Sequence, residues 1–154
     1  MRKIWAVIIA AVMALTFFGC TKDGGNYDAD IIADALNSEL QFGEELEKST
    51  QEAAYSIYGV DSSLCTKAAF YAGSSATADE IAVFNCVDDS ARQTVADAVQ
   101  ARIDYLREGY GSYGPDQVPK IDSASVITKG NTVIICICEN SDAVQGVIDS
   151  ASNK

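Results

Sequence analysis

The sequence predicts an α+β domain over residues 28–154, built on a largely antiparallel four-stranded sheet with covering helices in the order ααββαββα. Three observations support this class. Two pairs of β-rich segments are each joined by turn-forming residues, which favours two hairpins. A long amphipathic segment, Ser90–Glu108, separates the pairs. The run Val133–Cys138 is apolar at every position, as expected for a strand that is covered on both faces.

Two helices are expected ahead of the sheet. The first should run from Asp28 to about Leu40, because apolar residues recur there at helical spacing behind an aspartate that can cap the start. The second fits Ser49–Tyr58, with Ser49 as its cap and Gly59 as its stop. Residues 41–48 show no clear period, so we expect them to form a linker.

The first hairpin is expected from Leu64–Tyr71 and Glu80–Val87, which flank the turn-rich stretch Gly73–Thr77. Apolar side chains occupy both faces of the second of these strands. We therefore predict that it is a central strand of the sheet.

The long helix between the hairpins is predicted over Ser90–Glu108, behind two aspartates that cap and charge its start. Its inward stripe contains one charged residue, Arg102, among apolar ones: Ala91, Val95, Ala98, Val99 and Leu106. The next segment, Gly109–Pro115, is expected to be a loop. It contains Gly-x-Gly-x-x-Gly, but a dinucleotide site needs this motif between a strand and a helix, so we interpret it as a turn.

The second hairpin joins Ser125–Lys129 to Thr132–Glu139 through Gly130-Asn131, two residues that tolerate positive φ. A short amphipathic helix over Ser141–Ser150 is expected to close the domain.

The first twenty residues predict an export signal that ends at a lipidation site. Arg2 and Lys3 precede an uncharged run, Ile4–Phe18, that is shorter than the ~20 residues of a stable membrane span. The Gly19-Cys20 junction resembles a bacterial lipobox, in which the cysteine thiol is acylated with fatty acids such as palmitate. An ordinary signal peptide cleaved elsewhere is the alternative.

These features predict a lipoprotein signal peptide (residues 1–19), a flexible tether (residues 20–27) and one α+β domain (residues 28–154). Two or three acyl chains on Cys20 would hold the chain on the lipid bilayer at the extracytoplasmic face of the cell membrane. The formal net charge of −11 disfavours nucleic acid as a partner.

The chain contains no histidine, which removes the commonest general base and metal ligand. No Ser-x-x-Lys, Gly-x-Ser-x-Gly, phosphate-binding loop or calcium loop is present either, so no catalytic, cofactor or metal site is predicted. The leading hypothesis is a binding or envelope-interaction module for an unknown protein or envelope partner. The alternative is a histidine-free cell-wall hydrolase using Asp79/Glu80 or Asp116, which requires a pocket with two carboxylates about 5 to 10 Å apart. A substrate-capturing partner of a transporter is a third possibility.

Two further groups of residues have open interpretations. We favour buried free thiols for the domain cysteines, and one disulfide or a zinc site are the alternatives: Cys65, Cys86, Cys136 and Cys138. Tyr110, Tyr113 and Pro115 are candidates for a contact patch that takes a peptide or a sugar ring. We favour the structural interpretation, in which Tyr105 packs against the sheet, near Phe70, and the other tyrosines close over its edge.

The ordered motifs of the domain resemble the lipoproteins grouped as domain of unknown function family 4358. The resemblance rests on Ile57–Asp61, Ala78–Val83 with Asp88, Tyr113–Pro115 and Val126–Val133, and it covers most of the predicted domain. It implies a lipoprotein of Gram-positive, clostridial-type bacteria at the outer face of the cytoplasmic membrane. It implies no activity.

Overall fold

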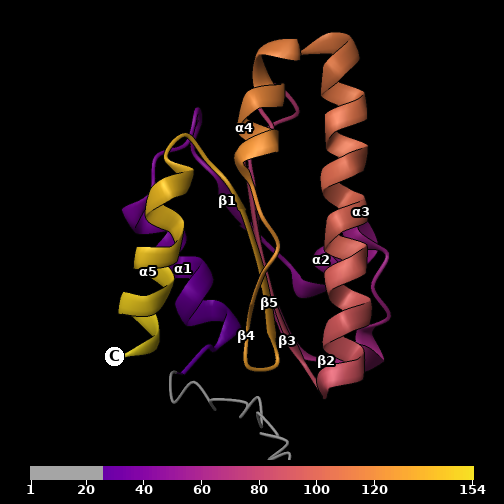
Figure 1. Ribbon diagram of the computed structural model, residues 1–154, viewed down its shortest axis with the longest axis vertical. Helices are drawn as coiled ribbons and strands as arrows, with labels where there is room; N and C mark the ends of the chain where they lie inside the picture. The colour runs from indigo at the N-terminus through magenta and orange to yellow at the C-terminus, as the bar shows by residue number, and fades with distance from the viewer. Residues whose placement is uncertain (1–25) are drawn as a thin grey trace, which may run out of the picture.

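The computed structural model describes residues 26–154 and has at its centre a five-stranded antiparallel sheet with the strand order β1-β2-β3-β5-β4 (Figure 1). The strands are β1 (Glu47–Ser49), β2 (Cys65–Ala72), β3 (Glu80–Cys86), β4 (Ile127–Lys129) and β5 (Thr132–Ile137). The predicted α+β class is confirmed. The predicted signal peptide (residues 1–19), the lipidation site at Cys20 and most of the predicted tether (residues 20–27) lie outside the described residues.

Helices cover both faces of this sheet. They are α1 (Ala29–Glu39), α2 (Gln51–Tyr58), α3 (Asp89–Tyr113), α4 (Val118–Ser123) and α5 (Val144–Ser152). The helices α1 and α5 pack on one face, and α2, α3 and α4 pack on the other, so the sheet separates two apolar clusters (Figure 1). None of the helices in the described part of the chain is both long enough and apolar enough to cross a membrane.

The central strand is β3, as predicted, because it pairs with β2 on one side and with β5 on the other. Its side chains alternate between the two clusters. Ile81 and Val83 belong to the cluster under α1 and α5, whereas Ala82 and Phe84 belong to the cluster under α2 and α3. All four are fully buried, which explains why this strand is apolar on both faces.

Local sequence signals determine several element boundaries. The Asp28 carboxylate accepts the N–H of Asp30 at 3.0 Å and caps α1. Gly59, at the end of α2, and Gly130, in the turn from β4 to β5, have φ of 64° and 53°, a conformation that glycine adopts without strain. The two predicted hairpins and the closing helix are confirmed.

The predicted number of strands is wrong by one. Glu47 and Lys48, expected in a linker, and Ser49, expected as a helix cap, form β1, which pairs only with β2. All three are exposed, so no alternation of apolar and polar residues marks this strand. Because Ser49 belongs to β1, the cap of α2 is Thr50, whose hydroxyl accepts the N–H of Ala53 at 3.2 Å.

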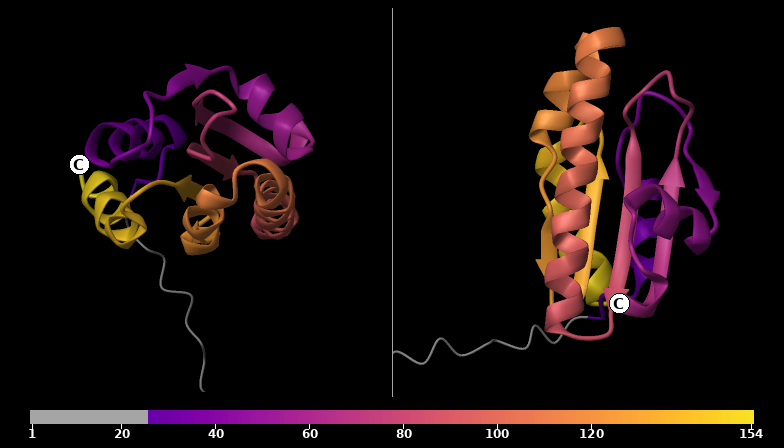
Figure 2. Two further views of the ribbon diagram at one scale, coloured as in Figure 1. Left: turned by 90° about the horizontal axis from the view of Figure 1, so that it is seen from above. Right: turned by 90° about the vertical axis from the view of Figure 1, so that its right-hand side faces the viewer.

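The helix α3 runs to Tyr113, so the expected end at Glu108 and the expected loop Gly109–Pro115 are wrong. Figure 2 shows this helix running the length of the domain. Tyr110 is buried and donates its hydroxyl to the Thr77 carbonyl. Gly109 and Gly111 have low helix propensity, and this hydrogen bond keeps them in the last turns of the helix. The helix α4, which is also unexpected, follows directly after a short 3₁₀ turn.

Candidate functional site

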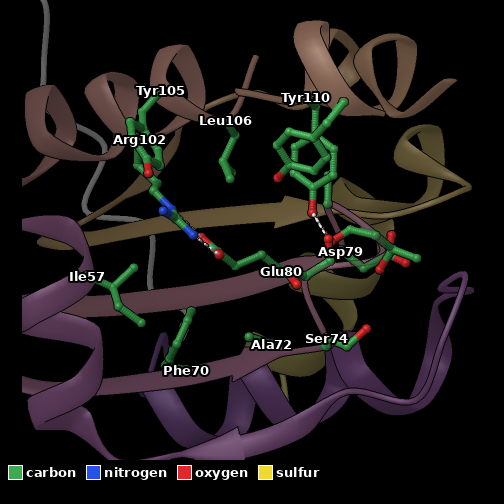
Figure 3. Close-up of a pocket in the computed structure, with 15 residues that line it drawn as sticks. Ile57, Phe70, Ala72, Ser74, Asp79, Glu80, Arg102, Tyr105, Leu106 and Tyr110 are labelled. Atoms are coloured by element: carbon green, nitrogen blue, oxygen red, sulfur yellow. Dashed lines mark hydrogen bonds and ion pairs between the residues drawn. The ribbon is translucent and has the colours of Figure 1, made fainter. Parts of the chain in front are cut away.

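A cleft lies between α2, α3 and the loop that joins β2 to β3, with a volume of about 260 Å³ (Figure 3). Three exposed apolar side chains form its rim: Ile57 (42% exposed), Tyr105 (67%) and Tyr113 (64%). We name it the aromatic cleft. The residues that line it are Ile57, Phe70, Ala72, Gly73, Ser74, Ser75, Thr77, Ala78, Asp79, Glu80, Arg102, Tyr105, Leu106, Tyr110 and Tyr113.

Different elements supply the two walls of the aromatic cleft. Figure 3 shows Ile57 and Phe70 on one side, from α2 and β2, and Arg102 and Tyr105 on the other, from α3. Arg102 and Tyr105 are three residues apart, which places them next to each other on one helix face. A second hollow lies between α2 and α3, and Ile57, Arg102 and Tyr105 line it as well as the aromatic cleft. The two concavities therefore adjoin.

An ion pair lies between these walls. Glu80, at the start of β3, is 4% exposed, and its carboxylate accepts hydrogen bonds from Arg102 Nη2 at 2.7 Å and Nε at 3.2 Å. Tyr58 donates its hydroxyl to the same carboxylate at 2.5 Å. Donors from α2 and α3 thus compensate a carboxylate that would otherwise be costly to bury.

This environment fixes the protonation of both donors. Burial, followed by the charge of Glu80, raises the pKa of Tyr58 well above its ordinary value. Burial is the largest single effect on Arg102 and opposes its charged form, but the hydrogen bond to Glu80 and the nearby negative charge together outweigh burial and raise the pKa of Arg102. The guanidinium carbon also lies 5.6 Å from the ring centre of Tyr105, within the range of a cation–π contact. Arg102 therefore connects the buried carboxylate to an aromatic ring at the rim.

The adjacent carboxylate, Asp79, is held by a separate set of partners. Its side chain is fully buried, with Lys120 Nζ at 2.8 Å and the N–H of Gly43 donating at 2.7 Å. Lys120 also lies 2.7 Å from a Glu139 oxygen. These contacts join α4 and the loop before β1 to the start of β3.

The tyrosines predicted as a contact patch do meet at the aromatic cleft. The rings of Tyr110 and Tyr113 are 4.8 Å apart, and both line the cleft. Tyr110 is buried, and burial followed by its contact with Tyr113 raises its pKa, so it is a structural support for the rim. Pro115 is exposed and lies outside the lining.

The carboxylates named for the hydrolase alternative are only partly brought together. Asp79 and Glu80 both line the aromatic cleft, whereas Asp116 does not. Each of the two is already engaged with a cation, Lys120 in one case and Arg102 in the other.

The cysteines of the domain are thiols in this structure: Cys65 is half-buried, and Cys86, Cys136 and Cys138 are buried. Within residues 26–154, no three side chains of the types that bind metals are grouped to hold an ion.

Ile57 and Arg102 are among the lining residues that the sequence did not indicate as site candidates. The signal for Arg102 was its place in an apolar helical stripe, since a charged residue there needs a buried partner. The separation of 22 positions between Glu80 and Arg102 gives no hint that Glu80 is this partner.

The described chain is thus an α+β domain with a helix-flanked aromatic cleft beside the start of its central strand. The chain belongs to the family described as Domain of unknown function (DUF4358), whose model matches residues 38–138 and includes every residue that lines the cleft. No curated protein and no solved structure matches the chain.

Proposed function

We propose that this chain is a membrane-anchored lipoprotein at the extracytoplasmic face, held by acyl chains on Cys20, whose domain is a binding or envelope-interaction module that uses the aromatic cleft. One observation supports this proposal most. Five large hydrophobic side chains are exposed in residues 26–154, and three of them line this one cleft. Exposed apolar side chains gathered in a concavity are typical of ligand and protein contact sites.

The chemistry of the rim indicates what the cleft suits. Tyr105 and Tyr113 present aromatic faces, and Ile57 presents an aliphatic surface opposite Tyr105. Aromatic faces of this kind pack on peptide side chains and on the apolar faces of sugar rings. We therefore infer a peptide segment or a sugar ring as the ligand.

The position of the cleft suits a chain that is anchored on its N-terminal side. Asn26 donates its N–H to the Ser152 carbonyl at 2.8 Å and lies beside Asn85, near the end of β3. The cleft gathers around Glu80, at the other end of this strand, about 20 Å away at the usual rise per residue. An anchor at Cys20 would therefore join the domain near the end of β3 that lies farther from the cleft.

The hydrolase alternative has one observation in its favour, because Asp79 and Glu80 both line the cleft. A glycoside hydrolase, however, needs one carboxylic acid that delivers a proton and a second carboxylate that reaches the sugar or a water. Both carboxylates here are buried and ion-paired. Binding is therefore the function that the cleft supports better.

Photo-crosslinking in the native cell tests the binding proposal. A photoreactive amino acid at Tyr105 or Tyr113 should give a discrete adduct. The same residue at Ile31 or Val87, the exposed hydrophobic positions outside the cleft, should give none. Equal yields at all four positions contradict the proposal. Release of soluble sugars from isolated cell wall by the purified domain, lost in Glu80→Gln, would support the hydrolase instead.

Metabolic labelling tests the anchor. Cells grown with an alkyne-tagged palmitate should label the parent chain, whereas Cys20→Ala should carry no label and leave the membrane fraction. Cys65→Ala, which changes a cysteine inside the domain, should keep both the label and the membrane fractionation. An unlabelled parent chain, or a Cys20→Ala variant that fractionates like the parent, contradicts the anchoring proposal.

A further inference from the structure

Two of the domain cysteines lie directly opposite each other on neighbouring strands. Cys65, the first residue of β2, is the register partner of Cys86, the last residue of β3. The ladder between these strands is irregular next to this pair, with a register shift between Cys65 and Lys67. The two thiols therefore face each other where backbone pairing of the hairpin is weakest.

The backbone hydrogen bonds on either side show whether Cys65 and Cys86 form a hydrogen-bonded or a non-hydrogen-bonded pair of the antiparallel ladder. The N–H of Val87 donates to the Leu64 carbonyl at 3.0 Å, whereas the N–H of Cys86 donates away from β2, to the Asn131 carbonyl at 2.8 Å. Cys65 and Cys86 thus form a non-hydrogen-bonded pair, in which the Cα atoms are about 4.5 Å apart and the side chains are at their closest. This separation lies inside the range of about 4.4 to 6.8 Å that disulfides span.

The environment of the two thiols makes them chemically unequal. Cys65 is half-buried and can be reached from solvent, whereas Cys86 is 5% exposed. A hydrogen bond with Cys86 lowers the pKa of the Cys65 thiol. The same hydrogen bond, together with burial, raises the pKa of the Cys86 thiol. Attack by a thiolate is the first step of disulfide exchange, so Cys65 is the thiol suited to begin it.

We propose that Cys65 and Cys86 are a redox site that forms a cross-strand disulfide with a disulfide-bonded oxidant, such as oxidised glutathione or a thiol–disulfide oxidoreductase. The Cys65 thiolate attacks one sulfur of the oxidant, forms a mixed disulfide and releases the other sulfur as a thiol. The Cys86 sulfur then loses its proton and attacks Cys65 Sγ, which releases the second oxidant thiol. Two protein thiols are oxidised, and one oxidant disulfide is reduced to two thiols.

The other two domain cysteines provide an internal comparison. Cys136 lies in β5 and Cys138 directly follows this strand, so their Cα atoms are about 6 to 7 Å apart, and both side chains lie in the cluster under α1 and α5. That geometry is at the limit for a disulfide. The proposal therefore assigns the bond to the pair that faces across the strands.

The test is a redox titration of the purified full chain. The reduced protein is equilibrated in glutathione buffers of increasing oxidised fraction, quenched with acid and alkylated under denaturing conditions, and its peptides are weighed. We expect oxidising buffers to remove two alkyl groups, both from the peptides that contain Cys65 and Cys86. Full alkylation of these peptides in every buffer, or a missing pair at Cys136 and Cys138, overturns the proposal.

Two variants sharpen this result. In Cys65→Ser, a change at a half-buried position, Cys86 should stay fully alkylated in every buffer, and protection of Cys86 there overturns the assignment. In the double variant Cys136→Ala with Cys138→Ala, oxidising buffers should still remove two alkyl groups. If this loss disappears while circular dichroism shows an intact fold, the assignment to Cys65 and Cys86 is overturned as well. The parent chain's peptide map decides the question even if this double variant fails to fold. The titration does not depend on membrane anchoring or on ligand binding, so its outcome is separate from that of the proposed function.

Discussion

The two faces of the sheet are covered in different ways. On one face, α1 and α5 pack against each other as well as on the strands, and together they cover the apolar cluster that contains Leu36, Ile81 and Ile148. On the other face, α2 and α3 contact each other only slightly, and the space between them is the aromatic cleft. The buried ion pair of Glu80 and Arg102 lies on this second face.

This difference suggests a division of roles between the faces. A face closed by two helices in mutual contact is stabilised mainly by apolar burial, supplemented by hydrogen bonds such as that from the Ala29 N–H to Asn85. The open face retains a buried carboxylate and a cation that apolar residues could replace with little loss of stability. The presence of this ion pair is consistent with a role for Arg102 in positioning Tyr105 at the cleft, since the guanidinium contacts the ring of Tyr105.

The largest effect is expected on the closed face. Leu36 of α1 is fully buried there, so Leu36→Ala should lower the free energy of unfolding by about 2 to 5 kcal/mol through lost burial and a cavity. Urea denaturation measures this loss, and amide chemical shifts of the residues around the cleft should stay unchanged. Large shifts at Tyr105 would show that the two faces are not independent.

A smaller loss of stability with a larger change at the cleft is expected from the ion pair. Arg102→Met leaves the Glu80 carboxylate buried without its cation, which should cost about 2 kcal/mol, less than a fully enclosed pair because solvent reaches the cleft. Amide shifts at Tyr105 should change as well. Arg102→Lys, which keeps the charge, should lose less in urea denaturation. Equal losses for the two variants would mean that packing of the side chain, not its charge, is what matters.

The smallest effect is expected at the surface beside α1. Lys67 and Lys48 lie 2.6 and 3.0 Å from Asp30, and their hydrogen bonds lower the pKa of this carboxyl below its ordinary value. A carboxyl with a lowered folded-state pKa adds stability above its unfolded-state pKa and loses it as the pH falls through the folded-state value. Because the pair is exposed to solvent, Asp30→Asn should cost only about 0.5 kcal/mol at neutral pH.

The difference between Asp30→Asn and the parent should shrink as the pH falls below the unfolded-state pKa of an aspartate, about 3.9, and disappear below the folded-state pKa. Thermal unfolding across this pH range measures it. Asp97→Asn, at an exposed α3 carboxylate outside the ion pairs described above, is the matched control and should change little at any pH. A difference for Asp30→Asn that does not depend on pH would rule out the ion pairs as its cause.

Much of the fold could be predicted because its signals are local. A capping aspartate precedes α1, glycine ends α2, and a glycine turn joins β4 to β5. Each of these residues satisfies backbone groups or backbone angles within its own segment. The burial of β3 on both faces is likewise indicated by the apolar residues of a single strand.

The missed elements depend on contacts that are distant in sequence. All three residues of β1 are exposed, and the strand is held by its pairing with β2, in which Ser49 lies opposite Phe70. The last turns of α3 contain two glycines, and Tyr110 holds them in place by bonding to a carbonyl 33 residues away. No helical period or propensity reports such an anchor.

The candidate site shows the same division. The tyrosines at the cleft were recognisable as a group because they follow one another closely on α3. The pairing of Glu80 with Arg102, and the approach of Ile57 from α2, require the packing of three elements. Their relation is a property of the tertiary structure and not of any segment.

Both outer strands of the sheet, β1 and β4, are only three residues long. A sheet edge offers unpaired backbone groups to other chains, and short edges with lysine or glutamate offer few of them. Glu47, Lys48 and Lys129 occupy these edges. The domain is therefore poorly suited to grow by strand addition, and crowded copies should stay separate molecules instead of joining into extended sheets.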